Sequence, residues 1–138
     1  MSQLASIVVI EEFHPGQYIF FEDDLDAHFY IIDEGQIQIF TKSPDGKRVN
    51  LATLGPGECF GELALIDRSP RSASAQALTF SKVYKISEKD YLTLLSELPD
   101  WAQILLKTFS DRIKKLNQVT REQNLLIREY KKQLKITD

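Results

Sequence analysis

The chain has 138 residues, enough for one domain with a sizeable core. Hydrophobic residues make up 43% and charged residues 27%, as in ordinary globular proteins, and a net charge of -3 gives no argument for nucleic acid or an anionic membrane as a partner. No apolar run approaches the ~20 residues that span a bilayer, and the single Cys59 excludes an internal disulfide and a multi-cysteine metal site. We therefore expect a cytoplasmic protein without membrane contact, in which Cys59 is a small buried side chain.

The first half of the chain predicts short strands separated by Gly and Pro turns. β-Branched residues dominate residues 7–13, and residues 36–40 alternate polar and apolar side chains, as a strand with one buried face does. Further strands are predicted at residues 18–21, 28–32 and 47–54. Turns are predicted at residues 14–16, 33–35, 43–46 and 55–57. The acidic residues 22–26 match no calcium-binding loop, so a solvated turn is expected there.

The second half predicts a last strand at residues 82–86 and then helices. Ser87, with Asp90 three residues later, is similar to a capping box and starts a helix near Glu88. Pro99 ends that helix and begins the next, which lacks Pro and Gly up to residue 135 and is expected to kink near Asp111. Its heptad row consists of Ile113, Leu116, Thr120, Gln123, Ile127, Tyr130 and Leu134. We assign residues 1–110 to a β-rich domain with short helices and residues 111–138 to a C-terminal helix.

Residues 60–77 carry the chemistry that points to a site. Glu62 stands where a helical turn begins, and the free backbone N–H groups of such a turn attract anions. Arg71, fixed behind Pro70, offers a planar fork of donors that suits phosphate. Alanine at every second position leaves a strand face of little volume, at Ala73, Ala75 and Ala77. Together these features predict a pocket for a small phosphorylated ligand.

This order of residues, Phe-Gly-Glu-Leu-Ala-Leu followed by Pro-Arg and small residues, resembles the phosphate-binding cassette of cyclic nucleotide-binding domains. That family includes regulatory subunits of cyclic AMP-dependent protein kinase, cyclic nucleotide-gated channels and bacterial cyclic AMP receptor transcription factors. The resemblance covers roughly residues 7–106. It implies a mainly β fold: an antiparallel β-roll, jelly-roll-like and built as a double-stranded β-helix, followed by a long C-terminal helix. Asp23 departs from the Gly often found there, so a locally altered loop is expected.

The resemblance also implies roles for individual residues. Glu62 accepts a hydrogen bond from the ribose 2′-hydroxyl, Arg71 pairs with the cyclic phosphate, and Ser72 donates to that phosphate. Gly61, Leu63 and Ala64 contribute backbone amides and close approach. The other candidate ligand contacts are Ala73, Leu51 as a core residue that also touches the base, and Asn117 and Thr120 as base-edge contacts from the C-terminal helix.

We therefore expect a regulatory domain that binds cyclic AMP or cyclic GMP and transmits binding through its C-terminal helix. Cyclic AMP is favoured because Ser72 follows Arg71, where cyclic GMP-selective relatives often have Thr. The chain shows no nucleophile–base constellation, so we expect no enzyme activity and no cofactor.

Two alternatives and several partners remain open. The first alternative is a degenerate member used as a protein-interaction module, and the second is a cupin-type enzyme, although His14 and His28 form no His-x-His metal motif. No helix-turn-helix follows the long helix, so we expect no direct nucleic-acid binding in this segment. The heptad row is a candidate surface for a homodimer.

Overall fold

The computed structural model describes residues 8–62, 64–65 and 68–134, with the side chains of residues 117, 118, 120, 121 and 131 outside the described part. The chain divides into two compact units, and the boundary along the sequence lies between Leu98 and Pro99. The first unit holds the strands and a short helix, and the second holds the long helix. The functional division expected after residue 110 stays a prediction.

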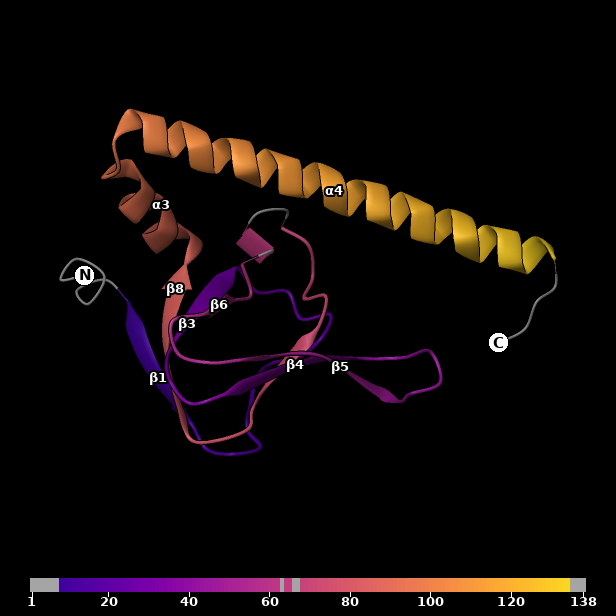
Figure 1. Cartoon of the computed structure of the whole chain (residues 1–138), viewed down its shortest axis with the longest axis horizontal. Helices are drawn as coiled ribbons and strands as arrows, with labels where there is room; N and C mark the ends of the chain where they lie inside the picture. The colour runs from indigo at the N-terminus through magenta and orange to yellow at the C-terminus, as the bar shows by residue number, and fades with distance from the viewer. Residues whose placement is uncertain (1–7, 63, 66–67, 135–138) are drawn as a thin grey trace. The chain divides into compact units, whose positions relative to one another are not determined.

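Within the described residues, eight strands form two antiparallel four-stranded sheets (Figure 1). The first sheet has the order β1 (Val9–Phe13), β8 (Ser81–Ser87), β3 (His28–Glu34) and β6 (Cys59–Phe60). The second has the order β2 (Tyr18–Phe20), β7 (Ser74–Ala77), β4 (Ile37–Lys42) and β5 (Arg48–Leu54). The expected antiparallel β-roll is thereby confirmed. The short strand β6 is the extended segment that we expected to end at Gly61.

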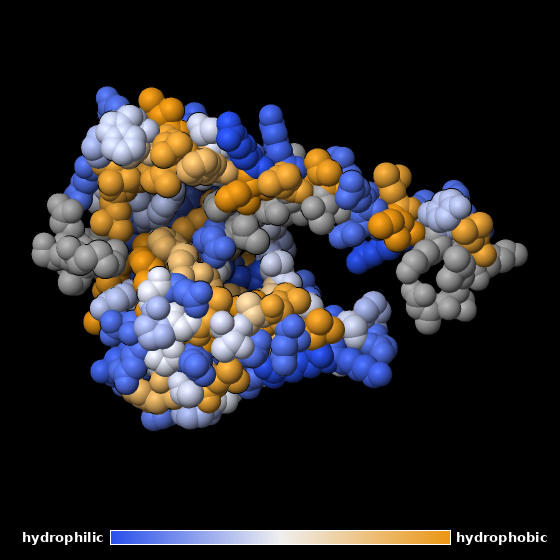
Figure 2. Space-filling view, viewed as in Figure 1, coloured by the Kyte–Doolittle hydropathy of each residue, from blue (hydrophilic) through white to orange (hydrophobic). Residues whose placement is uncertain are grey.

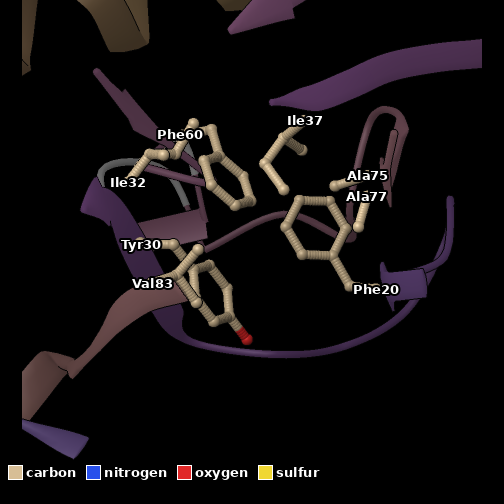
Figure 3. Packing of buried hydrophobic residues seen from close by; sticks show 8 residues of the cluster. All are labelled: Phe20, Tyr30, Ile32, Ile37, Phe60, Ala75, Ala77 and Val83. Carbon is tan, nitrogen blue, oxygen red and sulfur yellow. The ribbon is translucent and has the colours of Figure 1, made fainter. Parts of the chain in front are cut away.

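The core lies between the two sheets and is built from side chains of both (Figure 3). Three aromatic rings make its centre: Tyr30 stacks on Phe60 with centroids 5.2 Å apart, and Phe20 lies 5.9 Å from each. Ala75 and Ala77 of β7 are fully buried against this cluster. Small side chains at these two positions therefore make room for aromatic core residues, which fill the space that the sequence analysis assigned to a ligand.

Two backbone features fix the loops around the roll. Gly35 has φ +96°, and a Cβ there would overlap Ser81 and the carbonyl of Phe80, so only glycine allows β4 to begin so close to β8. Asp23 has φ 72°, the left-handed conformation that the sequence analysis expected Asp to tolerate at this position. The loop between β2 and β3 therefore has, at Asp23, the left-handed backbone conformation that a glycine would otherwise supply.

Helix α3 (Glu88–Ser96) begins as predicted, because the backbone N–H of Asp90 donates to the Ser87 hydroxyl at 3.1 Å. Tyr91 packs edge-on against Phe29 of β3, with centroids 6.0 Å apart, which holds α3 on the first sheet.

Helix α4 (Asp100–Gln133) forms the second unit and has 34 residues. It runs without interruption through Asp111, and Figure 1 draws it as one nearly straight element, so the kink expected there is absent. Figure 2 shows apolar side chains along this helix. Large exposed apolar residues include Trp101, Ile104, Leu116, Leu126, Ile127 and Tyr130. Among the described helices, none combines the length and the apolar character that a membrane span requires.

Candidate ligand-binding site

The cassette leaves strand β6 at Gly61, passes through a described helical turn at residues 64–65, and returns to strand β7 behind Arg71. Gly61 has φ +80°, and a Cβ at this position would lie 2.7 Å from Nη1 of Arg71 and 3.3 Å from the Phe20 ring. Glycine is therefore required twice, for its backbone conformation and for the close approach of the arginine. The structure thus brings together Gly61 and Arg71, two of the residues that the sequence analysis assigned to the site.

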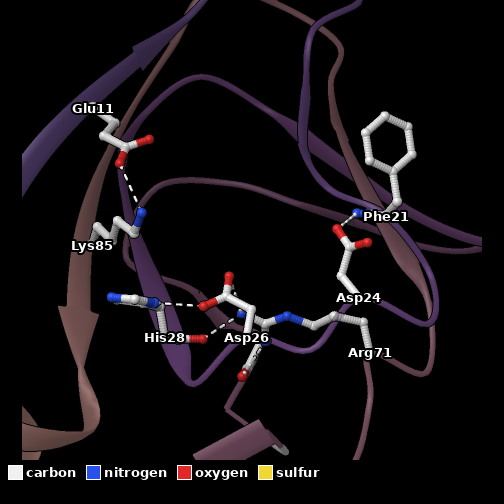
Figure 4. Close-up of polar contacts among 8 residues, drawn as sticks. Glu11, Phe21, Asp24, Asp26, His28, Arg71 and Lys85 are labelled. Atoms are coloured by element: carbon white, nitrogen blue, oxygen red, sulfur yellow. Dashed lines mark hydrogen bonds and ion pairs between the residues drawn. The ribbon is translucent and has the colours of Figure 1, made fainter.

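Arg71 is buried, with 4% of its surface exposed, and its guanidinium is held by the chain itself (Figure 4). Nη1 donates to the Gly61 carbonyl at 2.7 Å, and Nη2 donates to the His28 carbonyl at 2.6 Å. The guanidinium lies over the Phe20 ring, 4.1 Å from its centroid. Nε is buried without a hydrogen-bond partner among the described residues. A positive charge is therefore fixed beneath the cassette with one donor unsatisfied.

The acidic loop at residues 22–26 is exposed at Asp23 and Asp24, as expected of a solvated turn, and its backbone also supports Arg71. The backbone N–H of Asp23 donates to the Arg71 carbonyl at 2.7 Å, and the N–H of Arg71 donates to the Asp24 carbonyl at 2.9 Å. The Asp24 carboxylate caps the loop by accepting from the N–H of Phe21 at 3.0 Å. These bonds hold the backbone of Arg71 against the loop that joins β2 to β3. The left-handed residue of this loop, Asp23, is the one whose N–H reaches the Arg71 carbonyl.

Asp26 and His28 belong to the site, although sequence reasoning did not select them. Nη2 of Arg71 lies 3.2 Å from Oδ2 of Asp26, and Nδ1 of His28 lies 2.5 Å from the other oxygen, Oδ1. Partial burial tends to raise the pKa of Asp26, but the hydrogen bonds from His28 and Arg71 outweigh it and lower the pKa. Asp26 is therefore a carboxylate shared between two donors. The available signal in the sequence was the group of four acidic residues at positions 22–26, one of which could have been expected to pair with Arg71.

The remaining cassette residues divide between surface and interior. Glu62 and Ser72 are exposed, so their side chains are available to a ligand. Ala64 and Ala73 are buried, with 6% and 8% of their surface exposed. Leu63 lies outside the described residues. The carboxylate and the hydroxyl expected to bind ribose and phosphate thus lie on the solvent side of the buried arginine, and their roles stay predictions.

Leu51 is exposed, with 57% of its surface accessible, which corrects its expected place in the core. Strand β5 carries a bulge here: Ile39 pairs with Ala52 and Phe40 pairs with Asn50, so Leu51 has no partner residue on β4. A bulge of one residue re-aims the side chains of the strand that contains it. The apolar side chain of Leu51 is therefore free to contact a ligand.

The structure does not bring Asn117 and Thr120 into the site. Both residues are helical in α4, but their side chains lie outside the described part, and the second unit is described by itself. Their contact with a base stays a prediction.

Cys59 lies in β6 and is an exposed residue, so the expected buried side chain is wrong. Desolvation of the thiol, followed by the nearby Glu62 carboxylate, raises the pKa of Cys59 to about 12. At neutral pH the side chain is a thiol and a poor nucleophile. In the part of the chain that the structure describes, no group of three or more His, Cys, Asp or Glu side chains could hold a metal ion.

The comparisons with known proteins agree on one family. The family model described as "Cyclic nucleotide-binding domain" matches residues 10–97. The Cyclic AMP receptor protein of Thermus thermophilus is 36% identical over 99 residues, which cover 72% of this chain and 46% of that protein.

Solved structures show the same likeness. The Catabolite Activator Protein of Thermus thermophilus superimposes with a TM-score of 0.71 at 29% identity, over 91% of this chain and 57% of that one. The regulatory domain of Toxoplasma gondii PKA, crystallised with cAMP, gives a TM-score of 0.66 at 29% identity, over 80% of this chain and 41% of that one. The chain spans about half the length of the curated bacterial relatives it matches.

Proposed function

Because the chain belongs to the cyclic nucleotide-binding domain family, we propose that it is a cytoplasmic ligand sensor, not an enzyme, that binds cyclic AMP in preference to cyclic GMP. The observation that carries the proposal is the buried guanidinium of Arg71 directly beneath Gly61 and the exposed Glu62. A fixed cation next to the start of a helical turn favours a singly charged cyclic phosphate. The Thermus relative is named for cyclic AMP, and the similar PKA domain was crystallised with it, which supports the preference.

Binding at this site needs little rearrangement of the cassette. Arg71 is already immobilised by Gly61, His28 and Asp26, so the entropy of fixing a long side chain is lost during folding and not during binding. The Nε of Arg71, which has no partner among the described residues, is a further donor for charge-assisted bonding to the phosphate. The exposed Glu62 carboxylate is then the natural acceptor for a ribose hydroxyl, and exposed Leu51 offers apolar surface to a base.

Transmission of the signal is assigned to helix α4. A 34-residue helix with exposed Leu116, Ile127 and Tyr130 gains stability by burying that face, and a second copy of the helix provides a suitable partner. In this proposal the ligand binds one arrangement of the helix better than another, and helix pairing changes in return.

Calorimetry of the purified chain with cyclic AMP and cyclic GMP tests the function, with linear AMP as the control for nucleotide binding of any kind. We expect saturable binding of both cyclic nucleotides, tighter for cyclic AMP, and weaker binding of linear AMP. Clear preference for cyclic GMP would reverse the assignment of the base.

A second candidate function is a degenerate member that uses the fold as a protein-interaction module. The observation that favours it is that Asp26 and two backbone carbonyls already occupy the Nη atoms of Arg71. Absence of binding for either cyclic nucleotide at millimolar concentration would select this candidate.

A further inference from the structure

One end of the roll carries a polar layer on the inner side of the first sheet (Figure 4). His28 and Tyr30 lie two residues apart on β3 and therefore face the same side, and Lys85 stands opposite Tyr30 on β8. Nζ of Lys85 lies 3.2 Å from Oε1 of Glu11 on β1. The apolar core thus ends in a row of charged groups, at the same end where Arg71 is buried.

Within this layer, Asp26 links the imidazole of His28 to the guanidinium of Arg71, which also donates directly to the backbone carbonyl of His28. Its Oδ1 faces Nδ1 of His28 at 2.5 Å, and its Oδ2 faces Nη2 of Arg71 at 3.2 Å. The side chain of His28 is 36% exposed, whereas that of Arg71 is 3% exposed, so protons from solvent reach the histidine end of the row.

The charge of this row depends on His28. With His28 neutral, the charges of Asp26 and Arg71 cancel; with His28 protonated, the row has a net charge of one positive unit. Histidine is the side chain that changes charge between about pH 5 and 8. A cyclic phosphodiester keeps a single negative charge over that range, so only the protein side of the interaction changes.

We propose that His28 is a positioning residue of the site, which holds Asp26 against Arg71 and whose protonation tightens the binding of a cyclic phosphate. The inference rests on the proposed function and adds a regulatory input to it. When His28 is protonated, Asp26 is neutralised from its far side, and the guanidinium of Arg71 attracts an incoming anion with less competition from the carboxylate. By linkage, a bound cyclic nucleotide favours the protonated histidine to the same extent.

Other ionisable groups flank His28 and belong to the same field. They lie on strand β3 itself, on the strands β8, β1 and β6 of the same sheet, and at the start of α3. In that order they are Tyr30, Lys85, Glu11, Cys59 and Glu88. Lys85 and Glu11 form a neutral pair. Desolvation, followed by the Asp26 charge, raises the pKa of Tyr30, and the pKa of Cys59 is also raised, so both stay protonated. Glu88 pairs with Arg68. His28 is the one imidazole among these groups.

The test measures cyclic AMP affinity of the full chain by calorimetry from about pH 5.5 to 8 at constant ionic strength. Wild-type protein should bind about threefold to tenfold more tightly at the acidic end, the size expected for one partly screened charge near the ligand. His28→Asn keeps a donor to Asp26 without titrating, and should bind at the weaker level at every pH. His28→Lys carries a permanent charge, and should bind at the tighter level at every pH.

The chain supplies a matched control in its only other histidine. His14 lies in a turn, with its ring 5.7 Å from that of Phe80 and its backbone N–H bonded to Gln17. His14→Asn should therefore reproduce the wild-type pH dependence. Should His28→Asn fail to fold, proton NMR of the wild-type imidazoles replaces it: cyclic AMP should move the titration midpoint of His28 upward and leave that of His14 in place.

The two proposals fail in different ways. Equal wild-type affinity at both ends of the pH range, or an unchanged pH dependence in His28→Asn, overturns the role of His28 and leaves cyclic nucleotide binding intact. No binding at any pH removes the proposed function, and with it the role of the histidine.

Discussion

Arg71 and Asp26 lie 45 residues apart in the sequence, yet Nη2 of the arginine and Oδ2 of the aspartate are 3.2 Å apart. The arginine side chain is 3% exposed and the aspartate side chain 26%, so solvent screens their interaction only weakly. Removing either partner leaves the other charge in a poorly solvated place. The site is therefore sensitive to substitution for reasons of stability as well as of binding.

Arg71→Gln should weaken cyclic AMP binding at least tenfold, because loss of a buried charge-assisted contact costs about 2–5 kcal/mol. It should also lower the free energy of unfolding, since Asp26 and two carbonyls lose their donor. The matched control is Arg48→Gln, because Arg48 also lies over an aromatic ring, that of Phe40 at 3.7 Å, but outside the cassette. Calorimetry and thermal melting on both variants separate the effects, and unchanged affinity in Arg71→Gln removes this residue from the site.

Gly61→Ala should destabilise the protein and abolish tight binding. The added methyl group would lie 2.7 Å from Nη1 of Arg71 and 3.3 Å from the Phe20 ring, and such overpacking costs about 1–3 kcal/mol beyond the backbone strain. Gly57→Ala is the control, because Gly57 has nearly the same φ of +84° but no atom within 4 Å of an added Cβ. Denaturant unfolding should show a larger loss for Gly61→Ala. Equal losses would mean that strain alone, not the arginine, requires glycine.

Glu62 should recognise the ribose. Wild-type protein is expected to bind cyclic AMP more tightly than its 2′-deoxy analogue, since a hydrogen bond to a carboxylate contributes about 1.5–3 kcal/mol. Glu62→Gln should reduce that preference without changing the fold, because the residue is exposed. Competition binding with both nucleotides measures it. Equal wild-type affinity for the two would exclude Glu62 as a ribose ligand.

Asp26→Asn should lower stability in a pH-dependent way. The folded-state pKa of Asp26 is depressed, so its contribution is present above the unfolded pKa near 4 and is lost as the pH falls through the lower folded value. The difference in unfolding free energy between wild type and variant should therefore be larger at pH 6 than at pH 2.5. A double-mutant cycle with His28→Asn reports how much of it passes through the histidine. A constant difference across this range contradicts the assignment.

The apolar row of α4 should support a homodimer. Ile127→Lys places a charge in that row and should weaken self-association measured by analytical ultracentrifugation. Glu129→Lys also introduces lysine but two residues on, on the opposite side of the helix, and should leave association unchanged. A wild-type chain that stays monomeric at high concentration would refute pairing.

The sequence was sufficient for the features that depend on local patterns. Alternating side chains predicted the strands, Ser87 with Asp90 predicted the start of α3, and the spacing of Glu62 and Arg71 indicated the family that the comparisons confirm. These predictions succeed because each rests on residues within about ten positions of one another.

Features set by pairing between distant strands could not be predicted in this way. Asp26 reaches Arg71 only because β3 and β7 place a loop and the end of the cassette together. Leu51 lies outside the core because β5 is the edge strand of its sheet and is exposed on both faces from Arg48 to Thr53.

Strand β8 lies between β1 and β3 in the first sheet, although it is the last of the described strands along the chain. During synthesis β1 and β3 therefore leave the ribosome with the edges that β8 will cover still unpaired, and they cannot pair fully until residue 87 has emerged. Contacts of such long sequence separation form slowly, and exposed strand edges favour aggregation in the interval. The nascent chain consequently passes through a long vulnerable period, during which a holding chaperone would have most to protect.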